Sequence, residues 1–436
     1  MGRGGQQAVP LVSCRWRRLA DDPQLLRQLD AKLLGEAYAE RYLGFAKWLA
    51  PRAAHVRLLS VAALPGTPLA EPSDEDEGYA AQATVGLLAA CAAAGQLTSL
   101  SLELGAPFWQ GSWLPALRTL RRLRIEAHSL TPSIFEAPIP SLLALRELEL
   151  GDWPLSLESS ARLSASLTRL QLRYVDTDLL PEQLAVLTCL HTLSLHALTH
   201  DGAAYGALAV LSCLRQLSLS CCRALPASLS QLPFLEALSI DDQGGLMDQS
   251  ENEPASALAM ALPCLTQLTQ LALLAATPGG SEHARRAVEA SPLMPHLLAA
   301  LPGRSRLQSL LLAAGAPAGA QLPPGLAALH ELAAPAALLG RTLPAVAAAT
   351  SLQLVGVYAC NDATALPAIL RWAVRLPALN VLLLEAGRPY AEEVERAALL
   401  AHLEWHEQSP SAAHDFNLHV VPNAAAVLVA LAGIRG

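Results

Sequence analysis

One pattern, Leu-x-x-Leu-x-Leu with Ile, Val or Ala allowed, recurs along the chain at a nearly constant spacing. It starts at Leu97, Leu120, Leu145, Leu167, Leu190, Leu214 and Leu235, so that neighbouring units begin 21–25 residues apart. Further units start at Leu268, Leu307, Leu352 and Leu379, with a degenerate unit at Leu329 and an early one at Val56. A sustained period of this length predicts one stack of repeated units instead of several separate globular domains.

Each unit has the pattern of a short strand followed by a helical turn. The last two apolar positions of the pattern are two residues apart, so they face the same side of a strand. The residues that follow, as in 180–190 and 225–235, repeat Leu every three to four positions, which is typical of an α or 3₁₀ turn. A single unit cannot bury its own Leu set, but stacked units share a continuous core, in which each buried Leu contributes roughly 1.5–3 kcal/mol.

These units resemble the leucine-rich-repeat family over about residues 55–390. The resemblance implies an α/β fold, a leucine-rich-repeat solenoid with a curved parallel sheet on its concave side and helical turns on its convex side. We expect a short helical N-terminal module at 1–50, the solenoid at 51–390 and a C-terminal cap at 391–436. Longer steps between units predict insertions near 66–80, 243–256 and 277–303, the last with an extra helix that begins at Ser281.

The loops after the strands depart from the family pattern. The family usually has Asn or Cys at the ninth position of each unit, where the side chain satisfies backbone groups of the loop. Here that position holds Gly105, His128, Trp153, Val175, Leu198, Cys222, Gln243 and Cys360. A continuous Asn ladder is therefore excluded, and the loop backbone must find hydrogen-bond partners elsewhere.

A second resemblance precedes the repeats. The stretch Val12-Ser13-Cys14-Arg15-Trp16-Arg17-Arg18-Leu19, followed by Ala20-Asp21-Asp22-Pro23 and Leu25-Leu26, is similar to the C-terminal half of an F-box. F-box proteins with leucine-rich repeats are commonly substrate receptors of cullin-RING ubiquitin ligases, so the resemblance implies a Skp-type adaptor and a cullin as partners. The adaptor contact would then be made by Val12, Cys14, Trp16, Leu19, Pro23 and Leu25. The alternative is that Arg15–Leu19 form only a cap helix over the first repeat.

The composition argues against several other classes of protein. Hydrophobic residues make up 52% of the chain and charged residues 16%, which is enough hydrophobe to fold a core. The formal net charge is −8, without the basic excess that nucleic acid or an anionic membrane would attract. The richest apolar run, Ala424–Ile434, is shorter than the ~18–20 residues of a membrane span. Residues 1–10 lack a signal-peptide pattern and no Cys-x-x-Cys pair occurs, so we expect a cytoplasmic protein, with nuclear or axonemal association as alternatives.

The sequence contains no catalytic motif that we can identify. Phosphate-binding loops, nucleophile elbows and kinase signatures are all missing from it, so we expect no enzyme, no cofactor and no metal. His402 and His406 share one face of a predicted helix, with His414 beyond, and we interpret them as part of a solvated cap instead of a zinc site. The acidic run Glu71–Glu77 is likewise interpreted as a solvated loop before a helix at 79–94.

The concave sheet face is the better candidate for a site. The exposed strand positions are the third, fifth and seventh from the leading Leu of each unit. In the early units these positions, with their neighbours, supply Arg122, Arg124, Glu126, Glu147, Glu149, Asp152, Trp153, Arg169, Arg173 and Tyr174. Two interpretations stay open. Opposite charges such as Arg124, Glu149 and Arg169 pair across neighbouring strands and only stabilise the sheet, or the Arg and aromatic side chains form a protein interface, which favours that composition.

The sequence therefore predicts a non-enzymatic protein-binding receptor that resembles the substrate-recognition subunits of cullin-RING ligases. The alternative is a cytoskeletal or ciliary scaffold without a ligase connection. In the later units the same strand positions hold Leu311, Val381 and Leu383, an apolar patch that needs a partner, an internal cover or tolerance of exposure. Cys189 and Cys213 each precede a leading Leu, and we expect both to be buried.

Overall fold

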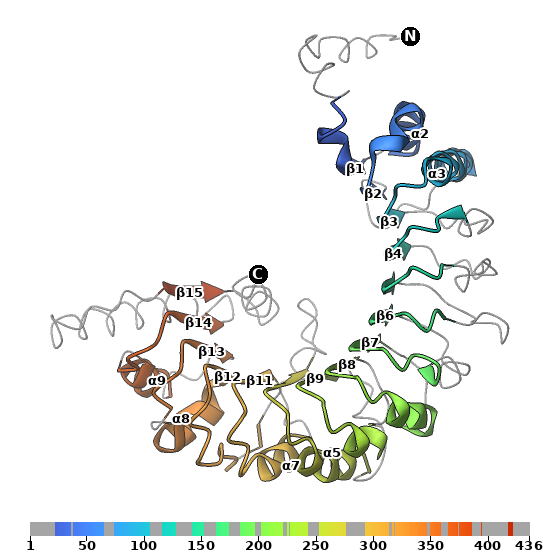
Figure 1. Cartoon of the computed structure of the whole chain (residues 1–436). Helices are drawn as coiled ribbons and strands as arrows, with labels where there is room; N and C mark the ends of the chain where they lie inside the picture. The colour runs from blue at the N-terminus through green and yellow to red at the C-terminus, as the bar shows by residue number, and fades with distance from the viewer. Residues whose placement is uncertain are drawn as a thin grey trace. The chain divides into compact units, whose positions relative to one another are not determined.

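The structure is a computed structural model of the whole chain. It describes residues 22–35, 38–64, 74–104, 116–127, 142–151, 163–173, 184–196, 202–220, 225, 227–242, 253–275, 293–313, 316–317, 319–346, 349–358, 365–373, 375–385, 394 and 417–421. The chain divides into two compact units, unit 1 at residues 1–190 and unit 2 at 191–436. Each unit is built from parallel strands with helical segments on one side of them (Figure 1).

Unit 1 has a parallel sheet whose strands follow one another in the order of the sequence. Its described elements are η1 (Leu25–Arg27), β1 (Gln28–Leu34), α2 (Tyr38–Leu49), η2 (Ala50–His55), β2 (Leu58–Leu64), α3 (Asp74–Ala94), β3 (Ser99–Leu104), β4 (Arg122–Ala127), β5 (Glu147–Gly151) and β6 (Arg169–Arg173). Each strand pairs with the next without a gap in the order, from β1 with β2 to β5 with β6.

Unit 2 repeats this arrangement with strands β7 to β15. Its described elements are β7 (Thr192–His196), η5 (Gly202–Val210), β8 (Gln216–Ser220), η6 (Ala227–Gln231), β9 (Ala237–Asp242), α5 (Glu253–Cys264), β10 (Gln270–Ala275), α7 (Leu293–Ala300), β11 (Ser309–Ala313), β12 (Glu331–Pro335), α8 (Ala336–Val346), β13 (Leu354–Tyr358), α9 (Leu366–Ala373), β14 (Val381–Glu385) and β15 (Asn417–Val421). All pairings within the unit are parallel and sequential.

The core consists of the Leu positions that the repeat predicts. Leu100, Leu123, Leu148 and Leu170 lie in register on β3 to β6, and each is at most 2% exposed. The residues between them alternate to the other face, so the strands β5 and β6 bury every second side chain. The predicted assignment of inside and outside positions is therefore confirmed for these strands.

Short turns lead into the strands and satisfy their own backbone. The amide of Leu120 donates to the carbonyl of Leu117, and the amide of Leu145 donates to that of Leu142, at 3.1 and 3.0 Å. Hydroxyl side chains add further hydrogen bonds from one repeat to the preceding one. Thr119 donates to the Leu97 carbonyl at 2.8 Å, Ser166 to Leu145 at 2.7 Å and Ser351 to Leu329 at 2.7 Å. These contacts give the carbonyls of the leading Leu residues a hydrogen bond before the strands begin, while the ninth-position residues lie outside the described ranges.

Helices α2 and α3 pack together on the helical side of unit 1. Tyr42 is fully buried, and its hydroxyl lies 3.1 Å from that of Thr84, which also donates to the Ala80 carbonyl at 2.8 Å. Burial raises the pKa of the Cys91 thiol, which is 1% exposed, to about 11. Helix α3 begins at Asp74, so part of the acidic run expected to form a loop belongs to the first turn of a helix.

The two ends of the chain differ from the expected domain organisation. Residues 28–34 form strand β1, whereas a helical module was expected there, because Leu29, Ala31 and Leu33 alternate with polar residues at the period of a strand. At the other end, strand β15 lies in the segment 391–436 that was predicted to be a cap. It pairs with β14, so the sheet extends into that segment. The helix predicted from Ser281 lies outside the described ranges.

Candidate functional site

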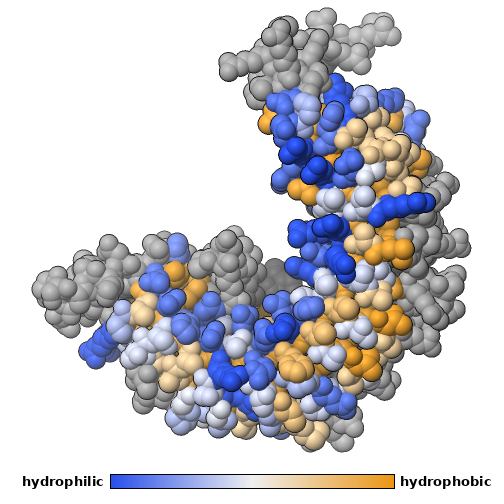
Figure 2. All heavy atoms as spheres, in the orientation of Figure 1, coloured by the Kyte–Doolittle hydropathy of each residue, from blue (hydrophilic) through white to orange (hydrophobic). Residues whose placement is uncertain are grey.

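The candidate site is the side of β3 to β6 that faces away from helices α2 and α3. We call it the open face, and it contains Ser99, Ser101, Glu103, Arg122, Arg124, Glu126, Glu147, Glu149, Arg169, Gln171 and Arg173. Hydrophilic side chains gather along this side of the unit (Figure 2). The period of two in each strand places them there, since the alternate positions are filled by the Leu core.

The strand register arranges these side chains in rows. Glu147 lies between Arg122 on β4 and Arg169 on β6. In the next row Arg124 lies opposite Glu149, which in turn lies opposite Gln171. Arg169 is thus the neighbour of Glu147 and not of Glu149, which corrects the predicted row of Arg124, Glu149 and Arg169.

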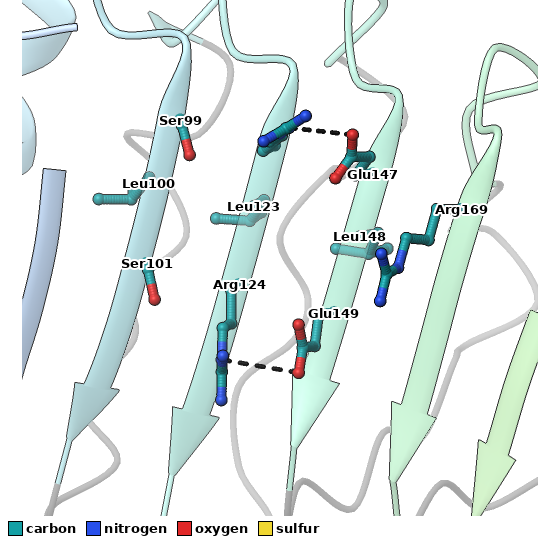
Figure 3. A pocket seen from close by; sticks show the side chains of 10 residues that line it. Ser99, Leu100, Ser101, Leu123, Arg124, Glu147, Leu148, Glu149 and Arg169 are labelled. Atoms are coloured by element: carbon teal, nitrogen blue, oxygen red, sulfur yellow. Dashed lines mark ion pairs between the residues drawn. The ribbon is translucent and has the colours of Figure 1, made fainter. Parts of the chain in front are cut away.

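Two ion pairs join β4 to β5. Nε of Arg122 lies 2.9 Å from Oε1 of Glu147, and Nε of Arg124 lies 3.6 Å from Oε1 of Glu149 (Figure 3). The first pair is exposed, with 65% of the Arg122 side chain accessible to solvent. Exposed pairs of this kind contribute little to stability, about 0–1 kcal/mol, so the two pairs mainly hold the side chains in defined positions.

Glu126 is the centre of a more buried network. Its side chain is 12% exposed, and it accepts hydrogen bonds from Nη2 of Arg124 at 2.7 Å and from Nη1 of Arg173 at 2.9 Å. Gly151 lies opposite Glu126 on β5, and a Cβ atom there would be 2.8 Å from Cγ of Glu126. The glutamate therefore passes over a position without a side chain and connects β4 to β6.

Arg124 is held by carboxylates on both sides. Its hydrogen bond to Glu126 raises its pKa, burial opposes that effect, and the charges of Glu149, Glu126 and Glu103 raise the pKa further. Like any arginine side chain the guanidinium is a cation, and its ion pairs with Glu126 and Glu149 orient it on the open face. A pre-organised surface of this kind loses less side-chain entropy when it binds a partner.

Arg169 differs from the other three arginines of the open face. Within the part of the chain that the structure describes, no ion pair or hydrogen bond connects its guanidinium to another residue. It borders a depression of about 280 Å³ together with Ser99, Ser101, Arg122 and Glu149. Figure 3 shows its side chain directed toward β5. The pairing interpretation thus holds for Arg122 and Arg124 and not for Arg169.

The structure describes only some of the remaining predicted site residues. Asp152, Trp153 and Tyr174 lie outside the described ranges. The same is true of Val12, Cys14, Trp16 and Leu19 in the segment similar to an F-box. Pro23 is exposed and Leu25 is 54% exposed in the turn before β1.

The predicted apolar patch of the later strands is buried. Leu311 is 8% exposed, Leu354 5%, Val381 9% and Leu383 fully buried, and they form one cluster with Ala333 and Tyr358. Tolerance of exposure is thereby excluded for this patch. Among the residues described in unit 2, it is part of the core and not an accessible surface.

Sequence reasoning was wrong about two cysteines. Cys189 and Cys213 are both exposed and neither forms a disulfide. Each precedes a leading Leu, the same position as Thr119 and Ser166, and that position points out of the turn. The burial of the leading Leu therefore does not predict whether the residue before it is buried.

Other kinds of site find no support in the described residues. They contain no group of three or more His, Cys, Asp or Glu side chains placed to bind a metal ion. None of the helices in these ranges is both long and apolar enough to span a membrane. His402, His406 and His414 lie outside the described ranges. The charged groups of the open face are arranged in ion pairs on neighbouring strands.

No family model matches the chain, and no curated protein does. Among solved structures, the chain is similar to an internalin (inlF) from Listeria monocytogenes at 17% identity, over 71% of this chain and 74% of that one, with a TM-score of 0.35. It is similar to internalin C2 of the same organism at 19% identity, over 51% and 83%, with a TM-score of 0.28.

The fold is established by the chain's own geometry. Within each unit, sequential parallel strands, buried Leu positions in register and helical segments on one side of the strands define a leucine-rich-repeat solenoid fold.

Proposed function

We propose that the chain is a non-enzymatic protein-binding receptor whose partner docks on the open face of unit 1. The observation that carries this proposal is the distribution of charge. On β3 to β6 the open face has four Arg and four Glu residues, whereas the equivalent described positions of β7 to β10 have Asp241 as their only Arg, Lys, Asp or Glu residue. Arg is enriched at the energetic centres of protein interfaces, because its planar guanidinium combines several donors with an apolar surface.

The ion pairs support the same proposal. Sheet stability does not require a charged outer face, since the Leu ladder already provides the core. Exposed pairs add little free energy but hold long side chains in one geometry. An ordered, polar and permanently charged surface is suited to the recognition of a complementary protein.

Site-specific photocrosslinking tests this proposal. A photoreactive amino acid replaces Ser101, which lies on the open face, and a matched variant carries it at Leu143, which is 79% exposed in the turn before β5. We expect a discrete protein adduct from position 101 and none of the same mass from position 143. The adduct should form again from the purified partner. Equal adducts from both positions, or adducts from position 143 alone, would contradict the proposal.

A finer role rests on the segment similar to an F-box. We propose that residues 12–26 dock a Skp-type adaptor, which would make the chain a substrate receptor of a cullin-RING ligase. The exposure of Pro23 and Leu25 supports this role, because both side chains are accessible to an adaptor. Size-exclusion chromatography of the full chain with a purified adaptor is the test. Co-elution should disappear in a Trp16→Ala and Leu25→Ala double variant and persist in Leu143→Ala. Failure of the wild-type chain to bind the adaptor would refute the ligase role and leave the open-face proposal intact.

A further inference from the structure

On the open face of unit 1, one of the four arginines forms no ion pair with the glutamates of that face in the described structure. Arg122 contacts Glu147, while Arg124 and Arg173 share Glu126. Glu149 lies beside Arg124, and Glu103 adds to the negative charge around the same arginine. Of the four arginines of the open face, only Arg169 has no carboxylate partner among the described residues.

The strand register explains why Arg169 lacks a carboxylate partner among the described residues. In the strand register Glu147 lies between Arg122 and Arg169, and its carboxylate is engaged by Arg122. Among the described residues Arg169 forms no ion pair within the sheet, and its side chain is directed toward β5, over the depression that Glu149 also lines. A guanidinium has five N–H donors in a fixed fork, which suits a carboxylate or phosphate presented from outside.

We infer that Arg169 is the anion-docking residue of the open face and that it binds an acidic side chain of the partner protein. This inference rests on the proposed function, since it names the chemistry of the partner at the same surface. Ser99 and Ser101 border the same depression from β3, at the end opposite Arg169, because β4 and β5 lie between those two strands. A carboxylate and a phosphate monoester share the chemistry that this guanidinium recognises.

Of these two anions, the surface favours the carboxylate. Arg122, Arg124 and Arg169 line the depression together with Glu147 and Glu149. Arg122 and Arg124 pair with the two glutamates, which leaves the single positive charge of Arg169. A carboxylate matches that single charge, whereas a phosphate monoester has a charge of about −1.5 to −2 at neutral pH and exceeds it. The partner segment therefore has Asp or Glu at the position that meets Arg169.

The experiment uses the full chain and an array of immobilised 12-residue peptides. Each acidic peptide is matched with a version in which Asp and Glu are replaced by Asn and Gln, and with a version that has phosphoserine at the same position. We expect the wild-type chain to bind acidic peptides about tenfold more strongly than their amide versions, and more strongly than the phosphoserine versions. Arg169→Ala should abolish this preference, and Arg169→Lys should retain part of it. Arg118→Ala, which removes the same charge from the exposed turn before β4, should leave it unchanged.

The outcomes separate the inference from the proposed function. Equal binding of acidic and amide peptides, a preference that survives Arg169→Ala, or the absence of peptide binding would overturn the anion-docking role of Arg169. A preference for phosphoserine would overturn the carboxylate assignment. None of these results affects the photocrosslinking at position 101, by which the proposed function is judged independently.

Discussion

Glu126 and Arg173 form an ion pair across an intervening strand. Oε1 of Glu126 on β4 lies 2.9 Å from Nη1 of Arg173 on β6, although β5 separates the two strands. The pair can form because Gly151 on β5 lies opposite Glu126 and has no side chain. The Glu126 side chain occupies the space above β5 that a side chain at position 151 would fill. A missing side chain on one strand thus links its two neighbours and orders the open face.

Gly151→Ala is expected to break this link. The new Cβ would lie 2.8 Å from Cγ of Glu126, so the glutamate must rotate away from Arg173. We expect a loss of about 1–3 kcal/mol in the free energy of unfolding, measured by urea denaturation, because a buried carboxylate loses a charge-assisted hydrogen bond. Gly44→Ala in α2 is the control, because no atom lies within 4 Å of its added Cβ and Ala is the better helix former. An unchanged stability for Gly151→Ala would show that Glu126 can move without cost.

Double-mutant cycles should rank the ion pairs by burial. The Glu126 side chain is 12% exposed and that of Arg173 38%, whereas the values for Arg122 and Glu147 are 65% and 33%. We expect a coupling free energy of about 1 kcal/mol for Glu126–Arg173 and less than about 0.5 kcal/mol for Arg122–Glu147. Raising the salt concentration should weaken the exposed pair more. Equal couplings at all salt concentrations would argue against a special role for Glu126.

The sequence was sufficient to predict the part of the fold that depends on period. The spacing of Leu gave the strands, and the alternation within each strand gave the inner and outer faces, as the burial of Leu123 beside exposed Arg122 shows. The register of the repeats also placed the charged residues on one face. These features follow from backbone geometry, which repeats regardless of the side chains in between.

The details of the site depend on distances that no period encodes. Arg122 and Arg169 both lie opposite Glu147 in the strand register, so the sequence pattern does not distinguish them. The side-chain conformations decide that Arg122 forms the ion pair with Glu147. The burial of Glu126 depends on Gly151, which appears in sequence as an ordinary end of a strand. Residues 28–34 form β1 and not part of a helical module, because Leu29, Ala31 and Leu33 alternate with polar residues at the period of a strand.

Two alanine substitutions should separate the core from the open face. Leu193 on β7 is fully buried, so Leu193→Ala should lower the free energy of unfolding by about 2–5 kcal/mol through lost burial and a cavity. Arg169→Ala removes an exposed side chain without an ion pair in the described structure, so it should change stability by less than about 0.5 kcal/mol. Both values come from denaturation curves. Similar losses from the two variants would mean that inside and outside have been assigned incorrectly.

The buried thiol of Cys91 should make stability depend on pH in the alkaline range. Burial raises its pKa from an ordinary value of 9.0 to about 11 in the folded chain, so the folded state holds the thiol proton more tightly than the unfolded state does. The stabilisation from this group is fully present below pH 9 and is lost as the pH rises toward 11, by at most about 2–3 kcal/mol. Urea denaturation at pH 8 and pH 11 should therefore show a stability difference between wild type and Cys91→Ala that shifts in favour of the variant at the higher pH. Cys264→Ala is the control variant, because Cys264 is exposed and its substitution removes a thiol while the buried Cys91 thiol stays in place. A constant difference for Cys91→Ala would mean that the thiol ionises in the folded chain as readily as in the unfolded one.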